Sequence, residues 1–299
     1  MMQSRRQFNK VVLASVPTAI ALGAPNSRYA GVQIGTISYS FRALPADQIL
    51  SAILKAGLSE VELMSNHAEA LLGAPAVKRT AGGIPDAEGQ AALQKWRAGV
   101  SMDKFKGLRK TFADAGVDIR ILCYNLVKGC PDDEIEYSFQ MAKALGALVI
   151  SSTAQISTAK RVGPFADKHK TMWGGHGHDR VEDPEEFATP ESFATIMSFG
   201  KYMGVNLDIG HFTAANYDPV AYIKEHHSRI TNLHLKDRKK NHGPNVPWGQ
   251  GDTPIKAVLQ LLRKEKYDLP ANVEYEYMGK DDPITEVGRC AQFCKEALA

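Results

Sequence analysis

Histidines and carboxylates follow the apolar residues of four late segments in this 299-residue chain. The runs are GGHGHD (174 to 179), LDIGHF (207 to 212), LHLKD (233 to 237) and VEYEY (273 to 277). Each run places His, Asp or Glu directly after residues typical of a buried strand. A lone histidine beside a strand is usually a packing or surface residue. Four consecutive segments with the same arrangement indicate instead that they share one site.

Two imidazoles and two carboxylates form a mixed nitrogen and oxygen donor set. Such a set suits Mn, Fe, Co or Zn, and it contains no sulfur ligand. We predict one divalent metal ion, with manganese expected first and Zn, Co, Fe or Mg as alternatives. The predicted ligands are His176, Asp208, His234 and Glu274, and His178 competes with His176 for the first place.

The elements that would carry these residues are short Val-, Ile- and Leu-rich runs alternating with longer amphipathic stretches. Strands are predicted at 32–41, 59–64, 117–124, 147–153, 170–178, 205–212, 230–236 and 271–277. Helical patterns cover 45–56, 103–115, 132–145, 190–203, 218–227, 254–265 and 283–297. This alternation predicts an α/β protein, a single (β/α)8 TIM barrel over residues 31–299. In such a barrel the carboxyl ends of the strands meet on one face.

Two long segments, 66–100 and 238–252, leave the carboxyl ends of the second and seventh predicted strands. Barrel enzymes build their sites on that face, so both segments are candidates for the rim of a site. A doubly wound open sheet is disfavoured because no Gly-rich phosphate turn follows the first predicted strand.

Three of the four runs resemble the xylose-isomerase-like TIM barrel superfamily of sugar phosphate isomerase/epimerase-like proteins. The similar features are the D-x-x-H of LDIGH, the His of LHLKD with the later PWGQGD (247 to 252), and the last residue of YDLPANVE (267 to 274). The resemblance implies that Asp208, His234 and Glu274 bind a divalent metal. The superfamily usually has a Glu in an E-N-H motif at the fifth strand, where this chain has His176-Gly177-His178.

That departure bears on the reaction, because epimerases of the superfamily use the missing Glu and the last Glu as an acid/base pair. The chemistry that stays available is proton removal next to a carbonyl, assisted by the metal. Candidate bases or acids are His178, His211 and Glu276. Strand alternation would put Glu276 on the same side as Glu274.

Further side chains are candidates for binding the substrate. Glu62 ends the second predicted strand, and Lys236 and Asp237 follow His234. Trp248 could stack on the apolar face of a sugar ring, with Gln250 donating a hydrogen bond nearby.

The first 30 residues are predicted to be a twin-arginine-type signal peptide. Arg5 and Arg6 precede an apolar stretch, Val11 to Ala24, that is too short for a permanent membrane span. We therefore expect a periplasmic protein with no membrane association after signal removal. Its 36 basic and 33 acidic residues are scattered, so no nucleic-acid partner is expected. The oligomeric state stays open, a homo-oligomer included.

The leading functional hypothesis is a metal-dependent sugar isomerase or epimerase acting on a small sugar or keto-sugar. One alternative is a lyase of the same family that cleaves a 3-keto-glycoside by β-elimination after the same proton abstraction. Another is a periplasmic carbohydrate-binding protein without catalysis, suggested by the missing fifth-strand Glu.

Overall fold

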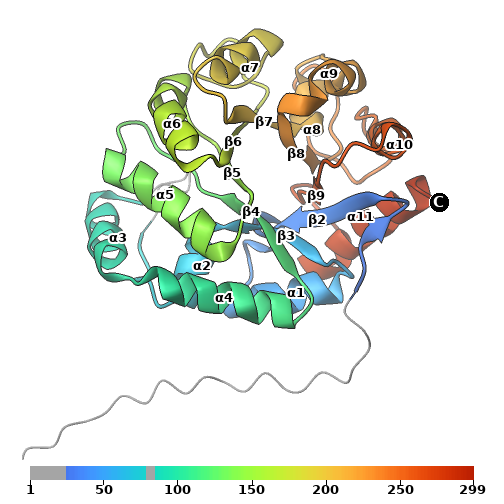
Figure 1. Ribbon diagram of the computed structural model, residues 1–299. Helices are drawn as coiled ribbons and strands as arrows, with labels where there is room; N and C mark the ends of the chain where they lie inside the picture. The colour runs from blue at the N-terminus through green and yellow to red at the C-terminus, as the bar shows by residue number, and fades with distance from the viewer. Residues whose placement is uncertain (1–24, 79–84) are drawn as a thin grey trace, which may run out of the picture.

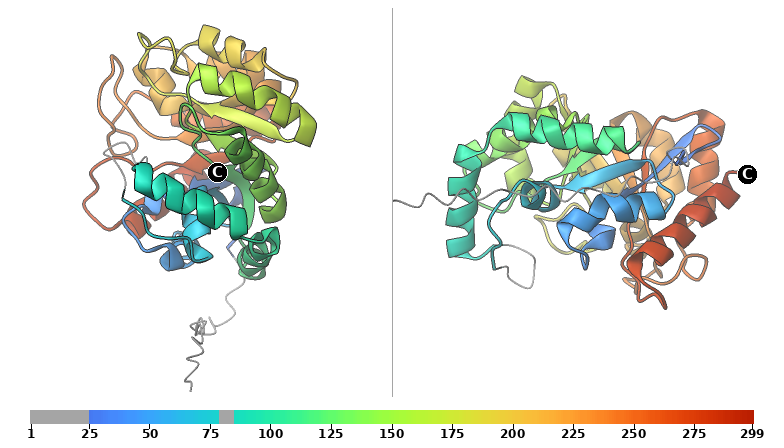
Figure 2. Two further views of the ribbon diagram at one scale, coloured as in Figure 1. Left: turned by 90° about the vertical axis from the view of Figure 1, so that its left-hand side faces the viewer. Right: turned by 90° about the horizontal axis from the view of Figure 1, so that it is seen from below.

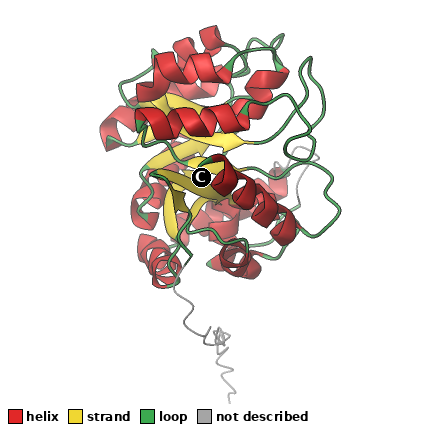
Figure 3. Ribbon diagram, turned by 90° about the vertical axis from the view of Figure 1, so that its right-hand side faces the viewer, coloured by secondary structure: helices red, strands yellow, loops and turns green. Residues whose placement is uncertain are grey.

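The computed structural model describes residues 25–78 and 85–299. Eight parallel strands, β2 to β9, follow one another around a barrel that closes where β2 pairs with β9. Figure 1 looks along this barrel, and Figure 3 shows the strands enclosed by the helices. The predicted single (β/α)8 TIM barrel is confirmed.

The strands are Arg28–Tyr29 (β1), Val32–Ile37 (β2), Glu60–Met64 (β3), Asp118–Cys123 (β4), Val149–Ser152 (β5), Met172–His176 (β6), Met203–Asp208 (β7), Ile230–Leu235 (β8) and Ala271–Val273 (β9). The helices are Ile49–Lys55 (α1), Ser65–Leu71 (α2), Ala87–Gly99 (α3), Met102–Asp114 (α4), Asp132–Leu145 (α5), Ile156–His169 (α6), Pro190–Met197 (α7), Ile209–Ala214 (α8), Pro219–His226 (α9), Ile255–Glu265 (α10) and Pro283–Ala297 (α11).

The core lies between the barrel and the surrounding helices, which bury one face each. In α10, for example, Ile255, Val258, Leu259 and Leu262 are buried at the spacing of one helical face. The last helix, α11, packs against α1 and β2, so the end of the chain closes the ring beside its beginning (Figure 2).

Two differences from the predicted elements lie close to the site. The strand predicted at 205–212 ends at Asp208, and the short helix α8 begins there instead. The reason is local, because the Asp208 carboxylate accepts a hydrogen bond from the His211 backbone N–H at 2.8 Å and caps the helix. His211 is therefore presented by a helical turn and not by a strand.

A second difference is α6, which the sequence patterns did not predict. Gly163 and Pro164 stand in its middle and obscure the helical pattern. Gly163 is needed because a Cβ atom there would lie 2.3 Å from the carbonyl oxygen of Phe199. Helix α7 also ends at Met197, earlier than predicted, since β7 already begins at Met203.

The long segment after β3 is packed onto the barrel. It contains α2 and α3, and Arg97 of α3 binds Glu69 of α2 and Glu134 of α5, each at 2.7 Å. Glu69 is buried and Arg97 is partly buried, so this ion cluster is a structural link between the segment and the barrel.

The first described residues form part of the fold. Strand β1 pairs antiparallel with β2, and the buried Ser27 hydroxyl donates to the carbonyl of Ile34 at 2.6 Å. Residues 1–24 of the predicted signal peptide lie outside the described residues, and its expected end at residue 30 falls in this hairpin. Among residues 25–78 and 85–299, no helix has the length and apolar character needed to cross a membrane.

Candidate metal centre

The structure brings the four predicted metal ligands together at the carboxyl ends of the last four strands. His176 ends β6, Asp208 ends β7, His234 lies near the end of β8, and Glu274 follows β9 directly. All four side chains are buried, and one ligand atom from each lies within 4.8 Å of the others. His178 is not part of this set. We call these four residues the ligand cluster.

The two histidines of the ligand cluster are oriented as metal ligands usually are. His234 Nε2 lies 2.8 Å from a Glu62 carboxylate oxygen, which leaves Nδ1 facing the cluster. His176 Nδ1 lies 3.1 Å from the Thr153 hydroxyl, which leaves Nε2 facing the cluster. The Glu62 carboxylate fixes the ring of His234 and its tautomer, and the Thr153 hydroxyl fixes the orientation of the His176 ring.

Two buried atoms of the ligand cluster, His234 Nδ1 and Glu274 Oε2, have no partner of hydrogen-bond geometry among the described residues. They lie 2.9 Å apart as an ion pair, and Lys236 Nζ is 3.0 Å from the same Glu274 oxygen. A buried polar atom without a partner costs about 1 to 3 kcal/mol. A cation held between these atoms would remove that cost, so the residues present fit a divalent metal ion.

The charges around the ligand cluster also favour a cation. The carboxylates of Asp208, Glu274 and Glu276 face the ammonium group of Lys236, and a fourth carboxylate, that of Glu62, lies beside His234. Burial acts to lower the pKa of His234, but Glu62 and Glu274 outweigh it and raise that pKa well above its usual value. The same negative potential that holds a proton on His234 attracts a divalent ion.

Lys236 lies inside the ligand cluster. Its Nζ atom is 3.0 Å from Asp208 Oδ2, 3.0 Å from Glu274 Oε2 and 2.5 Å from Glu276 Oε2. Burial acts to lower the pKa of Lys236, and the carboxylates overcome it and raise that pKa above its ordinary range. Lys236 was predicted to bind substrate, but its ammonium group is occupied by three carboxylates and neutralises part of their charge.

Glu276 lies beyond the end of β9, yet its carboxylate still faces the ligand cluster. It binds Lys236 and is partly exposed, whereas Glu274 is buried below it. Among the predicted acid/base residues, Glu276 is therefore open to solvent but already engaged in an ion pair.

His178 and His211 lie next to the ligand cluster. The His178 ring is 4.8 Å from that of His176 and 5.1 Å from that of His211 between centroids. His211 Nε2 lies 3.2 Å from Lys236 Nζ, and its Nδ1 lies 3.1 Å from an Asp179 oxygen. Burial, followed by the charge of Lys236, lowers the pKa of His211, so its imidazole is neutral at neutral pH.

Comparison with known proteins agrees with this arrangement. Residues 160–297, which hold all four residues of the ligand cluster, match the family described as xylose isomerase-like TIM barrel. This part of the chain is similar to the xylose isomerase-like TIM barrel family. A curated relative, the L-ribulose-5-phosphate 3-epimerase UlaE of Escherichia coli, is 27% identical over 92 residues. That match spans 31% of this chain and 32% of the relative's length.

Solved structures share the fold over most of this chain. The 3-keto-D-glucoside 4-epimerase YcjR from E. coli is 12% identical with a TM-score of 0.63, over 89% of this chain and 99% of that one. The probable 3-DHS dehydratase AsbF from Bacillus anthracis is 15% identical with a TM-score of 0.62, over 86% and 97% of the two chains. Identities this low show similarity of fold.

Glu62 lies behind the ligand cluster and not at the mouth of the barrel. It is fully buried, and one oxygen accepts from His234 and, at 3.0 Å each, from the side-chain amides of Asn232 and Asn272. The Ser151 hydroxyl donates to the other oxygen. The structure thus places Glu62, predicted to bind substrate, where it positions His234.

Asp237 also has a structural position that differs from its predicted role. Its carboxylate accepts the backbone N–H groups of Gly249 at 2.8 Å, Gly251 at 2.9 Å and Thr253 at 3.2 Å. A Cβ atom on Gly251 would lie 1.9 Å from Asp237 Oδ1, so only glycine fits there. Asp237 was predicted to bind substrate. In the structure its carboxylate holds the 238–252 loop.

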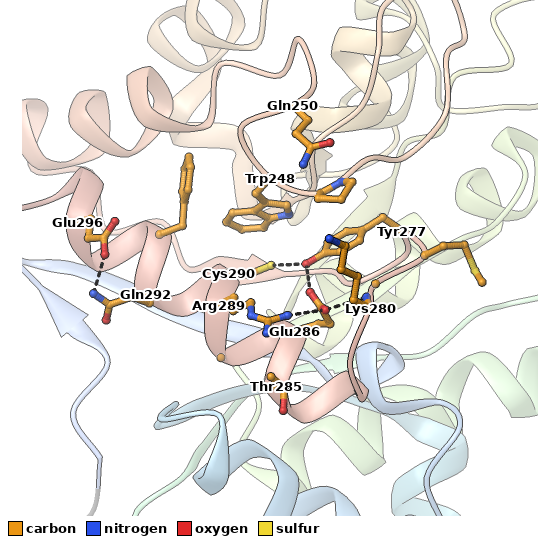
Figure 4. Close-up of a pocket in the computed structure, with 15 residues that line it drawn as sticks. Trp248, Gln250, Tyr277, Lys280, Thr285, Glu286, Arg289, Cys290, Gln292 and Glu296 are labelled. Carbon is orange, nitrogen blue, oxygen red and sulfur yellow. Dashed lines mark hydrogen bonds and ion pairs between the residues drawn. The ribbon is translucent and has the colours of Figure 1, made fainter.

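Trp248 and Gln250 line a groove of about 840 Å³ outside the ligand cluster (Figure 4). The groove lies between the 238–252 loop, the segment after β9 and helix α11. Trp248 packs edge-on against Phe293 with 5.6 Å between ring centroids. None of the four residues of the ligand cluster lines this groove, so the structure does not bring Trp248 and Gln250 to the predicted metal.

Sequence reasoning did not select several residues that position this site. Asp179 binds His211, Glu186 binds His178, and Arg238 Nη1 lies 2.8 Å from Asp179 and 2.6 Å from His211 Nδ1. Asp179 and Arg238 stand inside the runs GGHGHD and HLKDRKK, so their closeness to the candidate residues was a usable signal. Glu186 lies in a loop of acidic residues, and nothing in the sequence distinguished it from its neighbours.

Proposed function

We propose that this protein is a metal-dependent sugar isomerase or epimerase that removes a proton from the carbon next to a carbonyl group. The observation that carries the proposal is the buried ligand cluster with a histidine, His178, beside it whose Nε2 atom has no hydrogen-bond partner in the described structure. Similarity to a sugar phosphate 3-epimerase over part of the chain supports a sugar substrate.

The roles in this proposal follow from what each side chain already contacts. A bound divalent ion would polarise the substrate carbonyl and so acidify the neighbouring C–H group. His178, with its free nitrogen, takes the proton. Lys236 keeps Asp208 and Glu274 ionised through its charge. Glu276, three strands away around the barrel mouth, is the second proton-transfer group, paired with Lys236.

A 3-keto-glycoside lyase is the second candidate. His176 stands where related epimerases use a carboxylate, and it is committed to the ligand cluster, so the pair of carboxylates used for epimerisation is absent here. β-Elimination starts with the same proton abstraction and needs only one base, with a leaving group one carbon further on. The two candidates therefore share His178 and differ in the fate of the carbanion.

The test is incubation of the manganese-loaded protein with 3-keto-glucosides and free ketoses in deuterated water, followed by NMR. We expect solvent deuterium at a single carbon without loss of the aglycone. Release of the aglycone would assign the lyase. No exchange and no release with any of these sugars would contradict both, and sugar binding unchanged by a chelator would favour a protein that binds carbohydrate without catalysis.

The ligand cluster is tested by Glu274→Ala, with Glu296→Ala on the exposed face of α11 as the control. We expect the Glu274 variant to lose the metal in elemental analysis and to keep the circular dichroism spectrum of the folded barrel. Full metal occupancy in that variant would show that the ion is held elsewhere.

We further propose that the protein is exported through the twin-arginine route and cleaved before Asn26. Ser27 and β1 belong to the fold, so cleavage at residue 30 would remove a paired strand and the buried Ser27 hydroxyl. N-terminal sequencing of protein from the periplasmic fraction checks this. A mature chain that starts at Gly31, or an uncleaved cytoplasmic chain, would contradict it.

A further inference from the structure

A buried carboxylate in the loop after β6 holds one of the histidines beside the ligand cluster. Glu186 Oε1 lies 2.9 Å from His178 Nδ1, and the Glu186 side chain is 4% exposed. Its other oxygen, Oε2, accepts hydrogen bonds from Arg180, of which the Nε bond is 3.0 Å long. Burial acts to raise the pKa of Glu186, but His178 and Arg180 outweigh it and lower that pKa to about 2, so Glu186 is ionised.

An ionised carboxylate can only accept hydrogen bonds, so His178 Nδ1 must carry the hydrogen of the neutral imidazole. The lone pair of the ring is then on Nε2, which has no partner among the described residues. His211 differs in this respect. Its Nδ1 faces both Asp179 and Arg238, and its Nε2 faces Lys236, so neither nitrogen is free.

We propose that Glu186 is a positioning residue that fixes His178 as the Nδ1–H tautomer, which leaves the Nε2 lone pair free beside the ligand cluster. Arg180 has a defined part in this arrangement, because it donates twice to Oε2, while Oε1 accepts from His178 and, at 3.3 Å, from the Phe187 backbone N–H. The consequence for catalysis rests on the proposed function, in which His178 is the proton acceptor. The tautomer itself does not depend on that function.

The Glu186→Gln variant is the direct test. Arg180 still needs an oxygen at its side, so the glutamine amide turns its NH2 group toward His178 Nδ1. That group donates a hydrogen bond and thus favours the opposite tautomer, with the hydrogen on Nε2. We expect kcat to fall by about 10² to 10⁴, the usual contribution of a positioned acid or base, with KM and metal content unchanged.

The tautomer can be read without turnover by ¹⁵N NMR of the histidine side chains. The full chain would be used metal-free and zinc-loaded at about pH 8.5, above the ordinary histidine pKa, with His178→Gln to assign the signals. We expect a protonated Nδ1 in the unchanged chain and a protonated Nε2 in Glu186→Gln. The control is Glu182→Gln, at an exposed position in the same loop, which should change neither the spectrum nor kcat.

A double variant separates this role from a merely structural one. In Glu186→Gln with Arg180→Met, no guanidinium fixes the amide, so its oxygen can turn to His178 Nδ1. We expect the original tautomer to return and kcat to recover at least tenfold over the single variant. Loss of an ordinary packing residue would not be rescued by removing a second one.

The outcomes distinguish this inference from the proposed function. An unchanged tautomer in Glu186→Gln, or a double variant no better than the single one, would overturn the inference even if the protein turns over keto-sugars. If no sugar reacts but the NMR signals switch and return as described, the positioning by Glu186 holds and the proposed function fails.

Discussion

At the scale of single residues, the two histidines of the ligand cluster differ in the charge they carry before a metal binds. Burial lowers the pKa of His176 to about 4, so its imidazole is neutral at pH 7. Burial also acts on His234, but Glu62 and Glu274 raise its pKa well above the ordinary value, and it is protonated at pH 7. The difference arises because two carboxylates lie 2.8 and 2.9 Å from the His234 ring nitrogens, whereas the carboxylates beside His176 are 3.4 and 3.8 Å away.

Metal binding at pH 7 should therefore release about one proton per ion, the proton of His234, since a ligand nitrogen must be unprotonated. Affinity should fall as the pH is lowered, by roughly tenfold per pH unit for each proton displaced. Calorimetric titration of the metal-free protein in buffers with different ionisation enthalpies measures the number of protons released per metal ion. Release of no proton would mean that His234 is not a ligand or is already neutral.

The residue types and their order could be predicted from the sequence, because His176, Asp208, His234 and Glu274 each follow an apolar strand run. The contacts that the neighbouring side chains make could not be predicted. Nothing in LHLKD shows that the Lys236 side chain lies among three carboxylates, since this depends on how β7, β8 and β9 are placed side by side. Glu62 was predicted to bind substrate, whereas its buried carboxylate contacts His234. Strand position alone does not reveal how deep a side chain lies in the barrel.

At the scale of elements, the Asp237 side chain holds the end of the 238–252 loop, and Asp252 accepts the Lys240 N–H at its start. Asp237 accepts three backbone N–H groups of that loop and of the residue that follows it. The Gly and Pro content of the loop predicted an irregular segment at the barrel mouth. The hydrogen bonds to Asp237 that organise it could not be read from composition.

The Asp237→Asn variant should lower the free energy of unfolding by about 2 to 3 kcal/mol, because the amide loses charge and cannot accept at both positions. Hydrogen exchange at the Gly249 and Gly251 amides should become faster, with the metal content unchanged. The matched control is Asp252→Asn, at an exposed carboxylate of the same loop. Loss of metal together with unchanged stability would instead assign Asp237 to the site.

At the scale of the whole molecule, the barrel was predictable because its strands and helices repeat along the chain. Eight apolar runs give eight strands, and β2 pairs with β9 to close the barrel that this number allows. One helix that escaped prediction, α6, contains Gly163 and Pro164, and the glycine is required by close packing against the backbone of Phe199. Local composition contradicts the helix there, and tertiary contacts override it.

The end of the barrel opposite the ligand cluster contains a buried acid that makes the stability of the whole fold depend on pH. Glu60 begins β3, is almost fully buried, and has one carboxylate oxygen without a hydrogen-bond partner. Burial raises its pKa to about 8 from 4.5, and Arg120, 3.8 Å away, is too distant to compensate.

The direction in which stability changes with pH follows from the number of protons bound in the folded and unfolded states. Between pH 4.5 and about 8 the folded chain keeps a proton on Glu60 that the unfolded chain has lost, so stability is highest below that range and falls as the pH rises through it. Glu60→Gln stays neutral throughout, and its stability relative to the unchanged chain should increase by roughly 2 to 5 kcal/mol across the range. Urea unfolding at several pH values measures this, with Glu88→Gln at an exposed position of α3 as the control. A difference between the Glu60 variant and the unchanged chain that does not vary with pH would show that Glu60 is ionised in the folded barrel.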